Sequence, residues 1–198
     1  MENITNYLSE ILEIPLDAAS TCSNFYTSKK VSKNEFLLRE GEVCHQTFFV
    51  EKGLLRMYSI DKNGKEHIIQ FAPENWLISD RSSLYFNEQS SYFIDAIEDS
   101  EIVLLKQDFF INLTKIHPEI SINNNLLLHN HIRHLQRRVK LLLGATAEER
   151  YLDFMKMYPN VFRRAPQWMI ASFLGITPES LSRVRKELSK KNFGENLP

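Results

Sequence analysis

The spacing of apolar residues changes twice along the chain, and each change predicts a different kind of secondary structure. Residues 1 to about 27 carry apolar side chains at helical spacing, which predicts a helical entry segment. From Val31 to Lys106 the apolar runs become short and β-like. The Asn63-Gly64 pair between two such runs is typical of a β-hairpin. Strands this short and this frequent predict a compact antiparallel barrel or roll. The expected strands are residues 36–38, 47–50, 54–60, 67–71, 92–97 and 102–105.

From Pro118 onward the apolar spacing is helical. One long helix is predicted up to Gly144, and a capping box from Thr146 to Glu149 begins the next helix. Apolar residues recur along the long helix at intervals of four and three, which is the seam of a two-stranded coiled coil. A homodimer interface is one interpretation of this seam, and packing of the helix against its own sheet is the other. The seam residues are Leu128, Ile132, Leu135, Val139 and Leu142.

A helix-turn-helix is predicted near the C-terminus. Apolar residues recur at helical spacing between Pro166 and Leu174, and Gly175 permits the left-handed turn that ends this first helix. Thr177 is a good N-cap for the second helix, and Pro178 suits its first position. Two short helices joined by a three-residue turn form this motif. An ordinary helical hairpin with a solvated polar face is the alternative.

The second helix of this motif turns polar side chains outward. A helix that reads DNA needs such groups at major-groove base edges and at phosphates. The residues expected to contact DNA are Thr177, Pro178, Glu179, Ser180, Arg183, Arg185 and Lys186.

The net charge of −1 hides a strong asymmetry along the chain. Residues 129–198 hold 13 Lys and Arg against 6 Asp and Glu, a net charge of +7, whereas residues 1–128 carry −8. A basic final third predicts an anionic partner. Charge alone does not separate DNA from RNA or an acidic membrane, but the helix-turn-helix in the same segment favours DNA.

Composition excludes several other classes of protein. A hydrophobic content of 43% with 13 Phe excludes general disorder. The chain has only two cysteines, Cys22 and Cys44, which excludes a disulfide scaffold. They form no C-x-x-C pair, and a zinc ribbon or a four-cysteine iron–sulfur sensor is therefore excluded as well. No signal peptide or membrane span is predicted, so the expected location is the cytoplasm.

The remaining candidate chemistry is sparse. His129, His131 and His134 have no nearby carboxylate or cysteine to complete a metal site, so we expect solvated or dimer-flanking histidines and no metal. No catalytic motif or cofactor-binding loop occurs, and the protein is not expected to be an enzyme. Arg163-Arg164 is either a solvated pair or a phosphate clamp. A metal-dependent roll enzyme and a small-ligand module whose C-terminal helices contact protein are the rival classes.

The order of an acidic β-roll, a long helix, a hinge at residues 143–146 and a basic helix-turn-helix resembles the Crp/Fnr family of bacterial transcription regulators. The similarity runs from about Lys33 to about Lys190, and the wording of residues 170–183 is most similar to the Bacteroidetes-type branch. The roll motifs that carry it are Phe36-Leu-Leu-Arg-Glu-Gly-Glu42, Phe49-Val-Glu-Lys-Gly-Leu-Leu-Arg56 and Asn63-Gly-Lys-Glu66.

This resemblance implies an α+β fold in three parts. An antiparallel β-roll similar to a cyclic-nucleotide-binding domain is expected over residues 1–117, a dimerisation helix over 118–144, and a helix-turn-helix domain over 145–198. The implied function is sequence-specific transcription regulation by a homodimer whose effector is unknown. The implied partners are double-stranded DNA, a second copy of the chain and RNA polymerase, without a membrane.

The resemblance also assigns residues within the two sites. In the recognition helix, Glu179 and Arg183 match the family's base-reading positions, whereas Pro178 replaces an Arg. Glu179 can accept a hydrogen bond from a cytosine amine, and Arg183 can donate two to guanine. Thr177, Ser180, Arg185 and Lys186 are then expected at phosphates.

The phosphate cassette of cyclic-AMP-binding members is degenerate in this chain. Its Gly-Glu pair falls near Ile78 and Ser79, and its Arg falls on Ser90. Each lost charge-assisted bond is worth about 1.5–3 kcal/mol, so tight binding of cyclic AMP is not expected. A vestigial pocket filled by its own side chains is one outcome, and binding of a phosphate by Arg81 from a different direction is the other. The candidate pocket residues are Ser79, Asp80, Arg81, Ser82, Ser90, Ser91 and Arg133.

Overall fold

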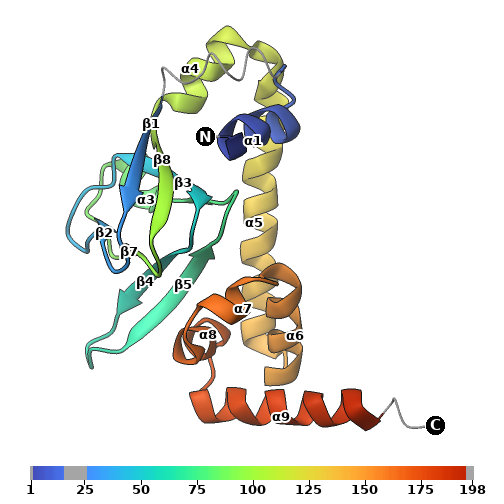
Figure 1. The fold of residues 1–198 in the computed structure, drawn as a ribbon. Coiled ribbons are helices and arrows are strands. Elements are labelled where there is room, and N and C mark those ends of the chain that lie inside the picture. The colour runs from blue at the N-terminus through green and yellow to red at the C-terminus, as the bar shows by residue number, and fades with distance from the viewer. Residues whose placement is uncertain (1, 16–25, 195–198) are drawn as a thin grey trace.

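The computed structural model describes residues 2–15 and 26–194, and its described strands pair into two antiparallel sheets (Figure 1). The strands are β1 (Tyr26–Val31), β2 (Phe36–Leu38), β3 (Gln46–Lys52), β4 (Leu55–Ile60), β5 (Glu66–Ala72), β6 (Leu77–Ile78), β7 (Phe93–Ala96) and β8 (Ser100–Lys106). One sheet has the order β1-β8-β3-β6 and the other the order β2-β7-β4-β5. The predicted antiparallel roll is therefore confirmed.

The apolar core of the roll lies between the two sheets. Val50 of β3, Leu55 of β4 and Ile94 of β7 are fully buried there. The hairpin of β4 and β5 turns at Gly64, whose φ of 78° lies in the left-handed region that glycine favours. The Asn63-Gly64 signal therefore marks the turn correctly.

Two strands were not predicted. β1 exposes its four central residues and buries only Tyr26 and Val31, so it lacks an apolar alternation, and pairing with β8 along its whole length holds it in the sheet. The predicted helical entry is therefore wrong at its C-terminal end. β6 has only two residues, too few to form a pattern. Cys22 lies outside the described residues.

Helices flank the roll at both ends of the chain. Those before the long helix are α1 (Glu2–Leu12), α3 (Arg81–Phe86), α4 (Phe109–Ile116) and the 3₁₀ turn η2 (Pro118–Ile120). The rest are α5 (Ser121–Gly144), α6 (Ala147–Met157), α7 (Val161–Arg164), α8 (Gln167–Leu174) and α9 (Pro178–Gly194). The helical region that follows the roll thus begins at Phe109, before its predicted start at Pro118. The predicted end of the long helix at Gly144 and the capping box of Thr146 and Glu149 are both present.

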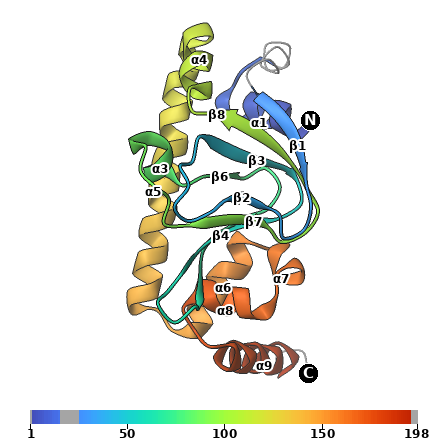
Figure 2. The same ribbon diagram turned by 90° about the vertical axis from the view of Figure 1, so that its left-hand side faces the viewer.

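The long helix α5 runs beside the roll from one end of the molecule to the other (Figures 1 and 2). α1 and α4 lie together near its N-terminal end, where apolar residues of α1, α4, β3 and β8 share one cluster. α6, α7 and α8 lie at its C-terminal end, and α9 crosses the end of the molecule remote from α4 (Figure 2). This arrangement leaves one side of α9 open to solvent.

Candidate nucleic-acid interface and effector pocket

Helices α8 and α9 form the predicted helix-turn-helix. α8 ends at Gly175, whose φ of 65° and ψ of 37° are left-handed. The Thr177 hydroxyl accepts a hydrogen bond from the Ser180 N–H at 3.2 Å, which caps α9 at its first turn. Leu181 and Val184 then face the buried cluster shared with α8. The capping and turn residues therefore act as the sequence predicts.

The outward side of α9 carries the three residues with the most direct potential for DNA contact. Glu179, Arg183 and Lys186 are all exposed. A hydrogen bond from its own backbone N–H and one from the Thr177 hydroxyl hold the pKa of Glu179 below its ordinary value. Glu179 is therefore an ionised acceptor at neutral pH, beside two cations on the same helix.

Arg185 has an intramolecular role that the sequence did not predict. Its guanidinium donates a hydrogen bond to the Gln167 side chain at 2.7 Å and lies 4.8 Å from the centroid of the Phe162 ring. These contacts join α9 to α7 and α8. Arg185 therefore stabilises the motif itself, and Arg183 and Lys186 are the freer cations.

The first helix of the motif is docked on the roll. The Ser172 hydroxyl accepts a hydrogen bond from the Ile68 N–H at 3.0 Å and donates one to the Glu66 carbonyl at 2.9 Å, both in β5. Beside it, the ring of Phe71 lies 5.5 Å from that of Phe173. α8 and the edge of β5 therefore share hydrogen bonds and one apolar core. Ser172 is a polar residue within a mostly apolar helical run, but the sequence does not show which distant strand it contacts.

Arg164 ties the C-terminal helices to the roll through two carboxylates. It donates to Glu74 at 2.8 and 2.9 Å and to Glu98 at 2.6 and 3.3 Å. Burial alone would raise the pKa of Glu74, but hydrogen bonds, chiefly from Arg164, hold that pKa below its ordinary value of 4.5. The two alternatives for Arg163-Arg164 therefore both fail for Arg164, which is a structural ion-pair residue. Arg163 is exposed.

The seam of α5 is partly exposed along its whole length, although Leu135 and Leu142 also line a cavity against their own chain. Leu128, Ile132, Leu135, Val139 and Leu142 are 40–56% exposed. Of the 24 residues of α5, all within the described part of the chain, none is buried. Contacts within its own chain therefore leave about half of each seam side chain uncovered. A row of large exposed apolar side chains on one helix is typical of a surface that a partner covers.

The segment that the resemblance assigns to the phosphate cassette contains a buried carboxyl group, that of Asp80. Asp80 is 4% exposed and caps α3 by accepting hydrogen bonds from the backbone N–H groups of Ser82 and Ser83 at 3.0 and 3.3 Å. The Ser90 hydroxyl, at the position expected for the family's Arg, donates to the other Asp80 oxygen at 2.8 Å. The Asp80 side chain therefore has its hydrogen-bond partners within its own segment of the roll.

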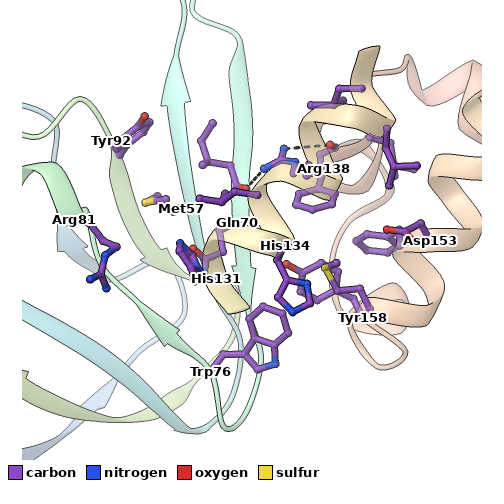
Figure 3. Close-up of a pocket in the computed structure, with 18 of the residues that line it drawn as sticks. Met57, Gln70, Trp76, Arg81, Tyr92, His131, His134, Arg138, Asp153 and Tyr158 are labelled. Carbon is purple, nitrogen blue, oxygen red and sulfur yellow. Dashed lines mark hydrogen bonds between the residues drawn. The ribbon is translucent and has the colours of Figure 1, made fainter. Parts of the chain in front are cut away.

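A cavity of about 360 Å³ lies between the roll, α5 and the C-terminal helices (Figure 3). Four of the predicted pocket residues line it: Ser79, Asp80, Arg81 and Ser82. The other three do not belong to its lining in the described structure, because Ser90 is buried beside Asp80 and Ser91 and Arg133 are exposed. The side chains that replace them come from α5 and the C-terminal helices: His131, His134, Arg138, Arg150, Tyr158 and Phe173.

Arg138 connects the three walls of this cavity. From α5 its guanidinium donates to the carbonyls of Ile68 and Ile69 in β5 and to that of Phe173 in α8. Dashed lines at Arg138 in Figure 3 mark hydrogen bonds to other residues of the cavity lining. Burial, together with the charges of Arg81 and His134, lowers the pKa of His131. Sequence reasoning missed Arg138 because a lone Arg beside an apolar seam gives no local signal.

The residues that the structure describes contain neither a cluster suited to a metal ion nor a helix suited to a membrane. No group of three His, Cys, Asp or Glu is placed to hold a metal ion, and the histidines of α5 are no exception. Within the same residues, no helix is long and apolar enough to cross a membrane.

The chain is built from a β-roll, one long helix and a helix-turn-helix, and this order of parts defines its class. Residues 28–117 match the family model described as "cyclic nucleotide-binding domain". The chain is 25% identical over 82% of its length to the regulatory protein HlyX of Actinobacillus pleuropneumoniae, of which 71% is covered. It is 27% identical over 79% of its length to the transcriptional activator protein anr of Pseudomonas aeruginosa, of which 68% is covered.

Solved structures agree with this architecture. FixK2 from Bradyrhizobium japonicum superposes with a TM-score of 0.70 at 22% identity, covering 84% of this chain and 86% of that one. The catabolite activator protein of Thermus thermophilus has a TM-score of 0.53 at 18% identity, covering 87% of this chain and 83% of that one. At these identities the likeness establishes the fold. Residues 28–117 thus match a cyclic nucleotide-binding domain, and the two relatives named here are a regulatory protein and a transcriptional activator protein.

Proposed function

We propose that this protein is a transcription regulator that binds DNA sequence-specifically as a homodimer. The observation that carries the proposal is helix α9. Its buried side packs against α8, and its other side exposes ionised and hydrogen-bond-donating side chains to solvent. A helix of this kind enters a major groove with its first turns at the base edges. The regulators HlyX and anr, to which the chain is similar, support the same function.

The residues at the start of α9 and along its outward side have defined roles in this proposal. Glu179 accepts a hydrogen bond from a base amine, and Arg183, four residues later on the same side, donates to guanine. Lys186 contacts a phosphate, and Thr177 and Ser180 lie at the first turn, near the backbone. Pro178 removes one base contact, so base preference at that step is relaxed.

The apolar seam of α5 forms the dimer interface, with two copies of the helix packed side by side. A two-fold axis through this seam presents two α9 helices to half-sites about 34 Å apart on the duplex. In this division, residues 1–117 are the sensor-like domain, 118–144 the dimerisation helix and 145–198 the DNA-binding domain.

The effector of this regulator is not cyclic AMP. The resemblance assigns the family's Arg to Ser90, which here bonds to the buried Asp80, and bringing a phosphate beside a buried carboxylate is unfavourable. The protein acts in the cytoplasm, contacts RNA polymerase as a regulator bound at a promoter would, and belongs to the Bacteroidetes-type branch of its family. The amino-acid sequence of residues 170–183 supports this last assignment.

Selection from a randomised duplex pool by the purified full-length protein tests the proposal. The expected product is a two-fold palindrome with half-sites one helical turn apart. The Arg183→Ala protein should lose about 1–3 kcal/mol and relax preference at one base pair of each half-site. Arg163→Ala, which changes an exposed cation outside α9, is the matched control and should recover the same palindrome as the unaltered protein.

Two results would overturn the proposal. One is binding without enrichment of any sequence, together with equal binding by the Arg183→Ala protein, which would favour a basic surface for protein contacts. The other is enrichment of a site without two-fold symmetry, which would remove the homodimer from the model of recognition.

A further inference from the structure

The exposed seam of α5 follows the two apolar positions, a and d, of a coiled-coil heptad. Its spacing assigns Ile132 and Val139 to position a and three leucines to position d. β-Branched residues at a with Leu at d favour a parallel pair of helices over larger bundles. The chemistry of the seam therefore suits one partner, a second copy of the same helix. The leucines at d are Leu128, Leu135 and Leu142.

The same heptad continues one step further toward the N-terminus of α5, where it meets a polar residue. Asn125 precedes Leu128 by three residues and Ile132 by seven, which places Asn125 at position a. Asn125 is exposed in the single chain. The apolar repeat therefore contains one polar residue at an a position, near the end of α5 that is remote from α9.

Contacts of the neighbouring residues determine the direction of Asn125. The side chain of Asn123 donates to the Leu12 carbonyl at 3.4 Å, and Leu127 packs against the cluster that α1 and α4 share. Both residues therefore face their own chain. Successive residues of a helix are rotated by about 100°, so Asn125 lies about 160° around the helix from either neighbour. Asn125 is thus on the far side of α5 from its own chain, in line with the seam.

A polar side chain in an apolar seam restricts how two helices can pair. The amide of Asn has both donors and an acceptor, so two Asn side chains that meet across a two-fold axis can satisfy each other. A slip of one heptad would place Asn125 against Ile132, and antiparallel pairing would place it against apolar residues at the other end of the seam. In both arrangements a buried amide would lack partners, which is unfavourable.

We propose that Asn125 sets the register of two α5 helices by hydrogen bonding to Asn125 of the partner subunit. This inference rests on the proposed homodimer and adds the positioning residue that aligns its two chains. A slip of one heptad would displace one chain along the other by about 10 Å. The two α9 helices would then lose their two-fold relation and could not both reach the half-sites of a palindrome. Asn125 therefore acts on DNA recognition without touching DNA.

Complementary charges at residue 125 test the register directly. The full-length Asn125→Lys and Asn125→Glu proteins are compared by sedimentation equilibrium in the absence of DNA. Each protein alone should have a dimer Kd at least about tenfold higher than the unaltered protein, because like charges meet at the axis. An equimolar mixture should dimerise with a Kd within about threefold of the unaltered value, because Lys then faces Glu. A general weakening of the seam would affect the mixture as well, so this recovery reports the pairing itself.

Two further changes separate the position from the residue type. Asn130 is an exposed Asn of the same helix, and it lies at position f, outside the seam. Lys and Glu at residue 130, alone or mixed, should leave the dimer Kd within about twofold of the unaltered value. Asn125→Ile should lower the Kd at least about tenfold, since a polar residue at position a specifies register at a cost in stability. Melting curves verify that every variant folds.

Three outcomes would overturn the proposal. Dimerisation of both charged proteins like that of the unaltered protein would place residue 125 outside the interface. Weakened dimers without recovery in the mixture would show that residue 125 does not face its counterpart. A higher Kd for Asn125→Ile would show that Asn125 does not act as a polar residue in an apolar seam. In each case the unaltered dimer still stands, whereas an unaltered protein that stays monomeric would refute the homodimer itself.

Discussion

Replacing Arg164 with alanine should loosen the DNA-binding helices from the roll before the rest of the protein unfolds. Arg164 bridges Glu74 and Glu98 with four hydrogen bonds, and its side chain is only 21% exposed. Its removal leaves these two carboxylates facing each other without a cation. Like charges at this spacing repel, so the variant loses an attraction and gains a repulsion.

The size of this effect follows from the geometry. At about 4 Å between charge centres and an effective dielectric constant of about 20, each of the two pairs contributes about 4 kcal/mol before any cost. Ordering long side chains and partly desolvating three charged groups offset most of that gain. Glu74 and Glu98 also stay 34% and 38% exposed, which screens them further. We expect a net loss of about 2 kcal/mol, or about 30-fold in the docking equilibrium.

The chain contains its own probes for this measurement. Its two tryptophans both lie where the C-terminal helices meet the roll. Trp76 packs 5.1 Å from Tyr158, and Trp168 lies 5.6 Å from the Arg56 guanidinium. In urea, tryptophan fluorescence of the Arg164→Ala protein should change at a lower concentration than far-UV circular dichroism, whereas the two transitions should coincide in the unaltered protein.

A double-mutant cycle and a neighbouring control make the test decisive. Glu74→Gln combined with Arg164→Ala should cost less than the sum of the single changes, by about 1 kcal/mol or more. Arg163→Ala alters the adjacent exposed residue and should leave both transitions in place. If the Arg164→Ala transitions coincide at an unaltered midpoint, the ion pairs do not hold the DNA-binding helices, and the reasoning fails.

Three further predictions follow from other contacts. The pKa of Glu74 lies below its ordinary value of 4.5. Its ion pair with Arg164 therefore stabilises the fold fully above pH 4.5, and this stabilisation is lost as the pH falls through the lowered pKa. Between pH 7 and 3.5, the urea midpoint should fall further in the unaltered protein than in Arg164→Ala. Leu135→Glu places a charge in the exposed seam and should yield monomers in sedimentation experiments, and a retained dimer would contradict the assignment of the seam. Lys186→Ala should weaken binding to all DNA sequences alike and reduce the salt slope by about one, so an unaltered slope would remove Lys186 from the phosphate contacts.

The helix-turn-helix was predictable because its chemistry is local. A left-handed residue at Gly175, a cap at Thr177 and the apolar face of α9 all lie within one short segment, and each fixes its own backbone. The same holds for the capping box at Thr146 and for the turn at Gly64. Each of these features needs no partner from a distant part of the chain.

The docking contacts and half of the pocket were not predictable, because their partners are far apart in sequence. Arg164 meets a carboxylate 90 residues earlier, and Ser172 bonds to a strand more than 100 residues away. Of the residues that the resemblance suggested, Ser79 and its neighbours line the cavity but Arg133 does not, since no local pattern shows which α5 residues face the roll. β1 stayed hidden for a similar reason, because only its pairing with β8 makes it a strand.

The exposure of α5 has a consequence for how stability is defined in this protein. Because no residue of this helix is buried within its own chain, the apolar side chains of its seam would be covered only in the dimer proposed above. Folding of the dimer proposed above is then a second-order reaction, and its midpoint rises with protein concentration by mass action. A tenfold dilution lowers the stability of the dimer by about 1.4 kcal/mol at 25 °C. The amount of protein in the cell, as well as any ligand, therefore sets the fraction of chains that can present two recognition helices together.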